Sequence, residues 1–586
     1  MRKKTWIAML LLPALLLAVC APLAAAEDTL HVIQVKDLPE DFILGMDLSS
    51  LLAEERSGVR YFDFDGREKD LLQIMADNGI THIRVRVWND PYDEQGRGFG
   101  GGNCDIGTAL EIGKRASQFG LKLIVDFHYS DFWADPGKYK APRAWEGLDA
   151  SAKAQALYAY TRESLETLRD ADVDVGMVQI GNEINNGLAG ETDWNAILPM
   201  LAAGARAVRE VCPEALVAVH FTEPHNRGLY SYYADLLRDY GLDYDVFGSS
   251  YYPFWHGTLE NLSEVLTEIN RNYGKQVMVL ETSWPYTGED TDFSGNSVNE
   301  DSWGTRDYPF TVQGQADAVR DVIDTVAHIP GGIGICYWEG AWITVGGASW
   351  EENSAKWEEF GSGWASSFAA VYDPDDAGRW YGGSSWDNQA FFDASGHPLA
   401  SLRLFSLLRS GSGDQSRRET APAPEEQPAE DLPNLLENGS FESGELSPWI
   451  LIDRCRGGEL FVEDKAVDSL EGSWHMHFWN PNRDSVDFDL EQTVEDLPEG
   501  SYVYSVSIMG GDCGETEIFA YVKVNGELRF TEPMRVTVWN SWDTAVIPQI
   551  ALSAGETLTV GVSVKCQGAG NGAWGKIDCA ALRAED

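Results

Sequence analysis

The chain has 586 residues, with 93 acidic against 44 basic side chains, so more than one domain is expected. The net charge of −49 leaves no basic face of the kind that nucleic acid or an anionic membrane requires. Because 21 Trp, 22 Tyr and 23 Phe supply ample apolar surface, the acidity does not indicate disorder. We expect a soluble protein whose ligand is neutral and has flat apolar faces, as sugars have.

The N-terminus has the pattern of a secretory signal. Basic residues 2–4 precede an apolar run, and the alanines 24–26 supply a small-residue cleavage site. We expect removal of residues 1–26, export to the extracellular space and no membrane association afterwards. An uncleaved anchor is the alternative, since the run is long enough to span a bilayer. Seven cysteines remain after cleavage, an odd number whose spacing assigns no disulfide.

Between residues 41 and 409, short apolar runs alternate with amphipathic helical stretches. The predicted strands are Phe42–Leu48, His82–Trp88, Leu121–Tyr129, Gly176–Asn182, Leu216–Phe221, Val246–Tyr252, Val277–Thr282 and Gly332–Trp338. The predicted helices are Arg67–Asn78, Ile106–Phe119, Ala152–Asp170, Trp194–Val211, Leu229–Tyr240, Leu259–Tyr273 and Val312–His328. This alternation indicates an α/β fold with a parallel sheet, and eight such strands predict a (β/α)8 TIM barrel over residues 27–409. An open doubly wound sheet is the alternative, but no Gly-rich phosphate loop follows the first strand.

The sequence changes character after the barrel. Residues 410–433 are rich in Pro, Glu, Ser and Gly and predict an extended linker. From residue 434 to 586, period-2 apolar patterns are separated by turn signals such as Asn525-Gly526. This pattern predicts an antiparallel β-sandwich of the jelly-roll type.

Two glutamates stand at the ends of apolar strands in the barrel. Glu183 follows Asn182 after the fourth predicted strand, and Glu281 lies at the end of the seventh. A charged side chain there costs free energy unless it is paired or used. Because the C-terminal strand ends of such a barrel form one rim, the two carboxylates are expected to face each other across a groove. The alternative for each is a solvated loop carboxylate.

A carboxylate pair of this kind has the chemistry to cleave a glycosidic bond. One acid protonates the leaving oxygen, and the other carboxylate attacks the anomeric carbon or activates a water. A separation of about 5–5.5 Å implies a covalent intermediate and retention, whereas about 6.5–9.5 Å implies inversion. The sequence leaves this choice open.

Further candidates lie near other strand ends. Arg84 and Arg86 share one face of the second strand, where they either hold a carboxylate in its charged form or make a structural ion pair. The remaining candidates, each with core packing as its alternative, are His128, Tyr251 or Tyr252 as donor to the nucleophile, and Trp88, Trp133, Trp255, Trp284, Trp338 and Trp342 as sugar-stacking faces.

Short motifs occur in order at nearly every predicted strand. They are Gly45-Met46-Asp47, Arg84 to Trp88, Asp126 to Pro136, Gln179 to Glu183, Glu281-Thr282, Gly334-Ile335 with Tyr337-Trp338-Glu339, and Gly361 to Trp364. Together they resemble glycoside hydrolase family 53, the endo-β-1,4-galactanases that act on the type I arabinogalactan side chains of pectin. The resemblance covers residues 41 to about 409.

The resemblance implies a retaining mechanism with Glu183 as acid/base and Glu281 as nucleophile. It also implies that Asn182 contacts the sugar hydroxyl next to the anomeric carbon. The acid/base must carry a proton before cleavage, so we expect the pKa of Glu183 to be raised while substrate is bound and that of Glu281 to stay low.

The loop after the seventh predicted strand carries alternating oxygen-bearing side chains that resemble a calcium-binding run. Calcium takes about 6–8 oxygen ligands. The resemblance implies two further ligands downstream, which gives the expected set Asp290, Asp292, Ser294, Asn296, Ser384 and Asp387. Ser294 departs from the family pattern, where a His is common, so its backbone carbonyl would have to serve. The expected ion is structural, and a flexible acidic loop without metal is the alternative.

The C-terminal region has the opening Asn438 to Trp449 and the closing Trp574 to Asp578 that are typical of jelly-roll carbohydrate-binding modules. It resembles family 61 of these modules, which bind β-1,4-galactan. Aromatic faces stack on pyranose rings and arginines donate to hydroxyls. The candidate ligand residues are therefore Arg454, Arg456, Trp479, Arg483, Trp539 and Trp574.

The whole sequence thus predicts a secreted, monomeric, retaining endo-β-1,4-galactanase with a galactan-binding module. Its expected partners are β-1,4-galactan and galacto-oligosaccharides. Two alternatives stay open: a barrel glycosidase acting on another β-1,4-glycan such as mannan, and a non-catalytic polysaccharide-binding protein.

Overall fold

The computed structural model describes residues 30–585, except 227, 300–307, 414–432, 456–457, 481–485, 496, 512, 537–541, 554 and 569–571. The predicted signal and most of the predicted linker therefore lie outside the described residues. Ser412 pairs with Val32, so the barrel unit extends a few residues beyond the expected boundary at 409. Across the described part of the chain, every helix is too short or too polar to cross a bilayer.

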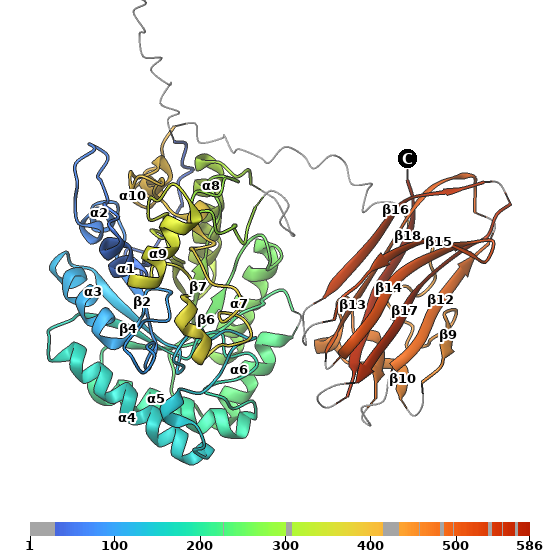
Figure 1. The fold of residues 1–586 in the computed structure, drawn as a ribbon, viewed down its shortest axis with the longest axis horizontal. Coiled ribbons are helices and arrows are strands. Elements are labelled where there is room, and N and C mark those ends of the chain that lie inside the picture. The colour runs from blue at the N-terminus through green and yellow to red at the C-terminus, as the bar shows by residue number, and fades with distance from the viewer. Residues whose placement is uncertain are drawn as a thin grey trace, which may run out of the picture.

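Eight parallel strands close into a barrel in chain order (Figure 1). They are β1 (Ile43–Asp47), β2 (His82–Val87), β3 (Lys122–Phe127), β4 (Val175–Ile180), β5 (Leu216–Phe221), β6 (Val246–Ser250), β7 (Gln276–Thr282) and β8 (Gly332–Tyr337). Each predicted strand is confirmed to within two residues at either end. The barrel fold is therefore confirmed, and the open sheet is excluded because β8 pairs with β1.

Helices lie outside the barrel strands (Figure 1). They are α1 (Leu51–Ser57), α2 (Leu71–Asp77), α3 (Ile106–Gln118), α4 (Ala150–Arg169), α5 (Trp194–Val211), α6 (Leu229–Tyr240), α7 (Leu259–Tyr273), α8 (Val312–His328), α9 (Trp350–Phe360) and α10 (Leu404–Leu407), with 3₁₀ helices η1 (Arg143–Trp145), η2 (Ser367–Val371), η3 (Asp387–Gln389) and η4 (Ala400–Arg403). The helix expected from residue 67 starts later, because the Asp70 side chain caps it by accepting from Leu72 N. Helices α1, α9 and α10 were not predicted from the sequence.

The barrel interior has an apolar layer below a polar one. Ile124, Met177, Ala218 and Met278 belong to a buried apolar cluster that β1 and β3–β8 supply. Side chains alternate across a strand, so the inward residues two positions further along these strands lie nearer the C-terminal rim. They are polar, among them Asp126, Gln179 and His220, and all are fully buried. The apolar layer therefore carries the site above it.

The sandwich consists of two antiparallel five-stranded sheets, ordered β10-β11-β18-β13-β16 and β15-β14-β17-β12-β9. The strands are β9 (Ile450–Asp453), β10 (Glu459–Asp464), β11 (Trp474–Trp479), β12 (Val486–Val494), β13 (Gly500–Gly511), β14 (Cys513–Val524), β15 (Glu527–Pro533), β16 (Asp543–Leu552), β17 (Leu558–Gly568) and β18 (Trp574–Glu585), with the 3₁₀ helix η5 (Ala466–Asp468) before β11. The predicted Asn525-Gly526 turn joins β14 to β15, with both residues at positive φ. The predicted antiparallel sandwich is confirmed.

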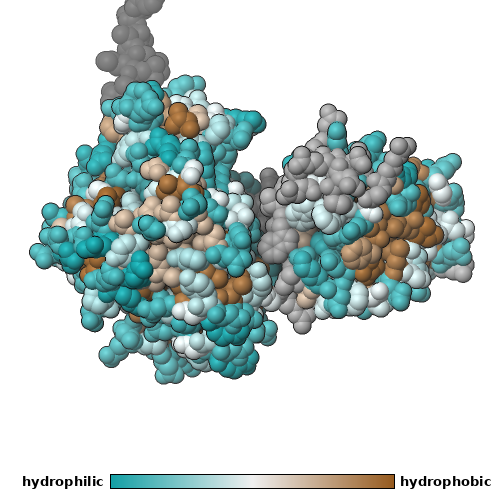
Figure 2. Space-filling view, turned by 90° about the horizontal axis from the view of Figure 1, so that it is seen from below, coloured by the Kyte–Doolittle hydropathy of each residue, from teal (hydrophilic) through white to brown (hydrophobic). Residues whose placement is uncertain are grey.

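The two units differ in their surfaces. The visible face of the barrel is mainly hydrophilic, whereas hydrophobic residues gather on that of the sandwich (Figure 2). Exposed apolar side chains of the sandwich include Ile450, Ile452, Leu528, Phe530 and Val546. Ile450 and Ile452 lie on β9 and Leu528 and Phe530 on β15, the two opposite edges of one sheet, so these exposed side chains fall into separate areas.

Candidate active site

Glu183 lies just beyond β4, in a strained turn. Its φ is 43°, a left-handed value that a non-glycine residue rarely adopts. Glu183 Oε1 accepts a hydrogen bond of 2.6 Å from Ser250 Oγ at the end of β6. Burial, and then the neighbouring charge of Glu281, raise the pKa of Glu183 well above its ordinary value. The site therefore favours a protonated Glu183, as an acid catalyst requires.

Glu281 lies in β7 at an irregularity of the strand. Ser249 pairs with Val279 and Ser250 with Glu281, so β7 holds one extra residue, Leu280, which packs in the barrel interior. A bulge re-aims the side chain that follows it. The glycine at position 248 leaves space for the Leu280 side chain, because a Cβ there would lie 2.2 Å from Leu280 Cδ1. Sequence reasoning located Glu281 but missed this bulge.

Two donors hold the Glu281 carboxylate. Arg84 Nη2 lies 2.8 Å from Oε1, and Tyr252 Oη donates to Oε2 over 3.0 Å. Burial raises the pKa of Glu281 to about 7, while Arg84 and the Tyr252 hydroxyl act to lower it. The expectation of a low pKa is therefore wrong for this site, because burial outweighs the cation. Glu281 is nevertheless the carboxylate that a cation stabilises in its charged form, whereas the neighbour of Glu183 is a neutral hydroxyl.

Both glutamates line one cleft of about 370 Å³. Asn182, Trp133 and Trp338 line it with them. Ser250, which donates to Glu183, pairs in register with Glu281, so the two carboxylates are near neighbours, as predicted. The cleft combines two carboxylates with broad aromatic faces, which suits a pyranose ring flanked by catalytic groups.

The two buried arginines of β2 do different work. Arg84 makes ion pairs of 2.9 Å with Asp47 and with Asp126, in addition to its pair with Glu281. Arg84 thus holds the Glu281 carboxylate and also takes part in a structural ion-pair network, so both predicted roles of this residue occur together.

Arg86 pairs instead with Glu339 at the end of β8, over 2.7 Å. Its guanidinium lies 4.4 Å from the ring centroid of Trp133 and 5.7 Å from that of Trp338. Arg86 also lines the cleft, as predicted for a substrate-binding residue. The Arg86–Glu339 pair therefore supports the aromatic wall of the cleft.

Asn182 and His128 line the cleft, as predicted. Asn182 Oδ1 accepts from Arg84 Nη2 over 3.1 Å, and its Nδ2 donates to Ala134 O over 2.8 Å. His128 Nδ1 accepts from Trp88 Nε1 over 3.2 Å, and its Nε2 lies 3.0 Å from Asp126 Oδ2. The partners of Nδ1 are N–H donors, which assigns the proton to Nε2.

Two predicted sugar contacts are wrong, and one of them, Trp284, is fully buried and is not among the residues that line the cleft. Trp88 is fully buried and lies behind His128, packed against Phe132 and Trp133. Its position at a strand end indicated the rim, but the loop residues that follow β3 cover it. Tyr252 is also buried, and it acts as the predicted donor to Glu281.

Sequence reasoning missed three functional groups. His220 in β5 is fully buried, and its Nε2 lies 2.9 Å from Ser250 Oγ. Burial holds the pKa of His220 well below its ordinary value, so the ring is neutral. His220 and Ser250 thus position Glu183. Trp386 lines the cleft, and its buried indole N–H has no hydrogen-bond partner among the described residues. The period-2 alternation of β5 could have indicated His220, whereas nothing in the sequence singles out Trp386.

The acidic loop after β7 brings three of the predicted metal ligands together. Asp290, Asp292 and Asp387 each offer a carboxylate oxygen within 4.8 Å of the others. Burial, and then Asp387, raise the pKa of Asp292 to about 7, and buried Asp387 Oδ1 has no hydrogen-bond partner within the part of the chain that the structure describes. A cation would relieve both the repulsion and the unpaired oxygen, so these residues fit a hard divalent ion.

The remaining predicted ligands make protein contacts beside this group. Ser294 Oγ accepts from Gly383 N over 2.9 Å, and Ser384 Oγ accepts from Trp386 N over 3.1 Å. Asn296 Nδ2 donates to Glu289 O over 3.1 Å. Ser384 and Trp386 also line the cleft that holds Glu183 and Glu281, so the acidic group and the cleft share a wall.

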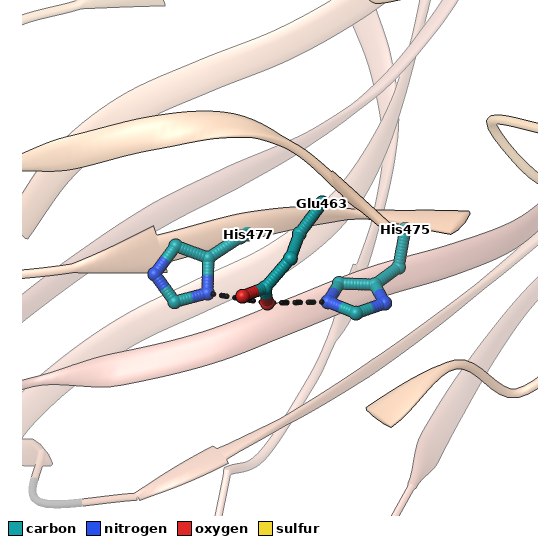
Figure 3. A group of neighbouring side chains, drawn as sticks. All are labelled: Glu463, His475 and His477. Carbon is teal, nitrogen blue, oxygen red and sulfur yellow. Dashed lines mark hydrogen bonds and ion pairs between the residues drawn. The ribbon is translucent and has the colours of Figure 1, made fainter. Parts of the chain in front are cut away.

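A second group with metal-binding residue types lies on the sandwich. Glu463 of β10 and His475 and His477 of β11 point toward one another (Figure 3). His475 Nε2 and His477 Nδ1 lie 3.1 and 3.3 Å from Glu463 Oε2. Lys576 Nζ, however, lies 2.7 Å from His477 Nδ1 and also bonds Glu463. The Lys576 ammonium thus occupies the position that a metal ion would take. The four side chains together link β10, β11 and β18.

Two predicted sugar-binding residues of the sandwich lie side by side. Trp479 of β11 is directly opposite Trp574 of β18. The adjacent Phe478 packs in the core, so Trp479 faces away from it, and 36% of its surface is exposed. Phe461, which sequence reasoning missed, is 43% exposed and packs against His477, with the ring centroids 4.8 Å apart. One outer sheet face therefore carries an aromatic strip.

The predicted arginines add little to this strip. Arg454 lies in the other sheet, where Asp487 and Asp489 bind its guanidinium over 2.6 and 3.0 Å. Its donors are thus committed to carboxylates rather than free for a ligand. Arg456, Arg483 and Trp539 lie outside the described residues.

The barrel unit is similar to known proteins. Residues 43–405 match the family model of glycosyl hydrolase family 53. Over 388 residues the chain is 53% identical to an endo-beta-1,4-galactanase of Bacillus subtilis, covering 66% of this chain and 90% of that protein. It is 35% identical over 311 residues to an arabinogalactan endo-beta-1,4-galactanase of Humicola insolens, and this match covers 51% of this chain and 89% of that protein.

Two solved structures are each similar to a part of this chain. The GH53 catalytic domain of Ignisphaera aggregans is 34% identical and covers 65% of this chain and 99% of its own, with a TM-score of 0.57. A solved module, TmCBM61 in complex with beta-1,4-galactotriose, is 28% identical and covers 26% of this chain and 99% of its own, with a TM-score of 0.22.

Proposed function

Because the chain belongs to glycosyl hydrolase family 53, we propose that it is a secreted, monomeric endo-β-1,4-galactanase that cleaves the galactan side chains of type I arabinogalactan with retention. The observation that carries the chemistry is the unequal setting of the two cleft carboxylates. Arg84 and Tyr252 hold Glu281, whereas the donors to Glu183 are the neutral hydroxyls of Ser250 and Thr222. Unequal settings of this kind separate an acid from a nucleophile.

In the proposed first step, Glu183 donates its proton to the glycosidic oxygen while Glu281 attacks the anomeric carbon. The C–O bond to the leaving sugar breaks as the bond to Glu281 forms. In the second step, Glu183 removes a proton from water, which attacks the anomeric carbon and releases Glu281. The raised pKa of Glu183 suits the first step. Its pKa must fall before the second, which follows once Glu281 is esterified and no longer a neighbouring charge.

The surrounding residues position the substrate. Trp338 and Trp133 provide flat faces, and the unpaired indole N–H of Trp386 is a donor for a sugar hydroxyl. The substrate assignment rests on the two relatives named as galactanases, because the match to this chain covers nearly the whole length of each.

We further propose a structural calcium ion held by Asp290, Asp292 and Asp387, with Ser294, Asn296 and Ser384 beside them. The ion would neutralise the carboxylates and fasten the loop after β7 to the segment that carries Trp386. Its role is to hold that wall of the cleft, and it takes no part in bond cleavage.

For the sandwich we propose binding of the same polysaccharide through the Trp479–Trp574 pair. A module attached by the predicted linker raises the local concentration of substrate at the barrel. Support comes from the exposed aromatic strip on its outer sheet face.

One experiment separates this proposal from its alternatives. The purified chain is incubated with β-1,4-galactan and with β-1,4-mannan, and the anomeric configuration of the first products is followed by NMR. We expect hydrolysis of galactan alone, with the β-anomer appearing first. Preference for mannan would identify a different barrel glycosidase, and the α-anomer first would show inversion. Binding without hydrolysis would identify a non-catalytic protein.

A further inference from the structure

Three of the sandwich cysteines gather at one end of the β15-β14-β17-β12-β9 sheet. Cys513 begins β14, Cys566 lies in β17, and Cys455 follows β9. Cys513 Sγ lies 3.1 Å from Cys566 Sγ, so a movement of about 1 Å would bring the sulfurs to the S–S bond length of about 2.05 Å.

An irregularity in the ladder produces this approach. Cys513 pairs with Gly568 and Thr516 with Cys566, so three steps along β14 oppose two steps along β17. In a regular ladder Cys513 would shift by one residue, and its side chain would then point to the opposite face from Cys566. The extra residue turns Cys513 to the face of Cys566, which belongs to the buried core of the sandwich.

We propose that Cys513 and Cys566 form a disulfide that joins β14 to β17. Cys513 is partly exposed, whereas Cys566 is only 1% exposed. Cys513 is therefore the thiol that an external oxidant reaches, and Cys566 is the resolving thiol.

The oxidant is a soluble disulfide such as oxidised glutathione. The thiolate of Cys513 attacks one of its sulfurs, forming a mixed disulfide and releasing one glutathione thiol. The thiolate of Cys566 then attacks Cys513 Sγ and releases the second. The two cysteines lose two protons and two electrons, and the glutathione disulfide accepts both.

Cys455 is the competing partner for Cys566. It lies on the other side of β17, next to β12, where its sulfur accepts from Asp487 N over 3.2 Å and contacts Asp487 O at 3.5 Å. These contacts hold Cys455 in place, whereas Cys513 already touches Cys566. The geometry thus selects one pair from the three thiols.

The pairing is tested by peptide mapping of the full chain. The protein is equilibrated with oxidised glutathione, its free thiols are alkylated under denaturing conditions, and its peptides are analysed by mass spectrometry without reduction. We expect a cross-linked peptide pair containing Cys513 and Cys566, with Cys455 alkylated. Alkylation of both Cys513 and Cys566, or a link from Cys566 to Cys455, would overturn the proposal.

A stability measurement tests the same bond independently. Cross-links lower the entropy of the unfolded chain, and the two residues are 53 positions apart. Reduction with dithiothreitol is therefore expected to lower the melting temperature of the sandwich by roughly 10 °C. Cys455→Ser should keep this sensitivity and Cys513→Ser should remove it. If the melting temperature of Cys513→Ser still falls on reduction, the proposed pairing is wrong. The peptide mapping uses the unmodified chain, so it does not depend on whether a variant folds.

Discussion

The barrel and the sandwich bring functional side chains together in different ways. All barrel strands run in the same direction, so their C-terminal ends meet at one rim, and Glu183, Ser250 and Glu281 converge from β4, β6 and β7. In the sandwich, neighbouring strands run in opposite directions, and only the pairing register places Trp479 opposite Trp574. A position along the chain therefore predicts a site in a closed parallel sheet, whereas an antiparallel sheet requires its pairing to be known.

The largest test of the barrel assignment is Glu281→Ala. Loss of the attacking carboxylate is expected to lower kcat on galactan by at least about 1,000-fold. The matched control is Glu339→Gln, which removes a buried carboxylate that pairs with Arg86 and is not among the residues that line the cleft. We expect the control to lose much less activity, and Glu281→Ala to keep the binding of galactan by the sandwich. Near-normal turnover by Glu281→Ala in initial-rate assays would refute the nucleophile assignment.

Tyr252→Phe is expected to have the next largest effect. Loss of a hydrogen bond to a charged group costs about 1.5–3 kcal/mol, so kcat should fall by between about 10- and 100-fold. The Tyr252 hydroxyl lowers the pKa of Glu281, which burial raises to about 7. Because the nucleophile must be ionised, the acidic limb of the kcat/KM profile should lie near pH 7 and move to higher pH in the variant.

The control for this profile is Tyr251→Phe. The Tyr251 hydroxyl donates to Gly257 O rather than to a carboxylate. Its profile should keep the acidic limb of the unmodified protein. An unshifted limb in Tyr252→Phe would mean that this hydroxyl does not act on Glu281.

Much of the barrel site was predictable because strand period and strand order place residues without knowledge of loops. Glu183, Glu281 and the donor Tyr252 were found in this way. The errors arose where contacts between distant segments decide: Trp88 is covered by the residues after β3, and the bulge at Leu280 depends on room beside Gly248. The raised pKa of Glu281 likewise follows from burial, which no local pattern contains.

The sandwich was predicted as a fold but less well as a site. The period-2 alternation of apolar residues predicted the strands of the sandwich, but it does not show which outer sheet face binds a ligand. Arg454 illustrates the limit, because its two aspartate partners lie on a neighbouring strand more than thirty positions away. Phe461 joins the strip through β10, and the sequence offers no sign of that pairing.

The sandwich site is tested by Trp479→Ala. Loss of an aromatic stacking face is expected to weaken the binding of the full chain to insoluble galactan by about 10-fold, with hydrolysis of soluble oligosaccharides unchanged. The control is Ile450→Ala, which removes an exposed side chain from the other sheet. Trp449→Phe would not serve, because Trp449 is buried. Equal binding by Trp479→Ala and Ile450→Ala in pull-down isotherms would place the ligand elsewhere.

The smallest expected effect concerns the acidic loop that borders the barrel cleft. The folded state raises the pKa of Asp292 above its unfolded value, to about 7, mainly through burial and the charge of Asp387. Without metal, the stability contributed by protonated Asp292 is complete below about pH 4 and is lost as pH rises through about 7. A bound cation removes this penalty, so calcium should raise the melting temperature by about 5 °C at pH 8 and by less at pH 5.

Asp387→Asn is the matched variant for this measurement, because it removes one charge from the acidic group without a change in size. Calorimetric scans with calcium and with a chelator should differ for the unmodified chain and coincide for the variant. If scans of the unmodified chain coincide at pH 8, the three carboxylates hold no ion. The wall shared by this loop and the cleft then depends on hydrogen bonds such as Ser384 N to Asp292 Oδ2, at 2.7 Å, and the link between metal binding and the position of Trp386 is lost.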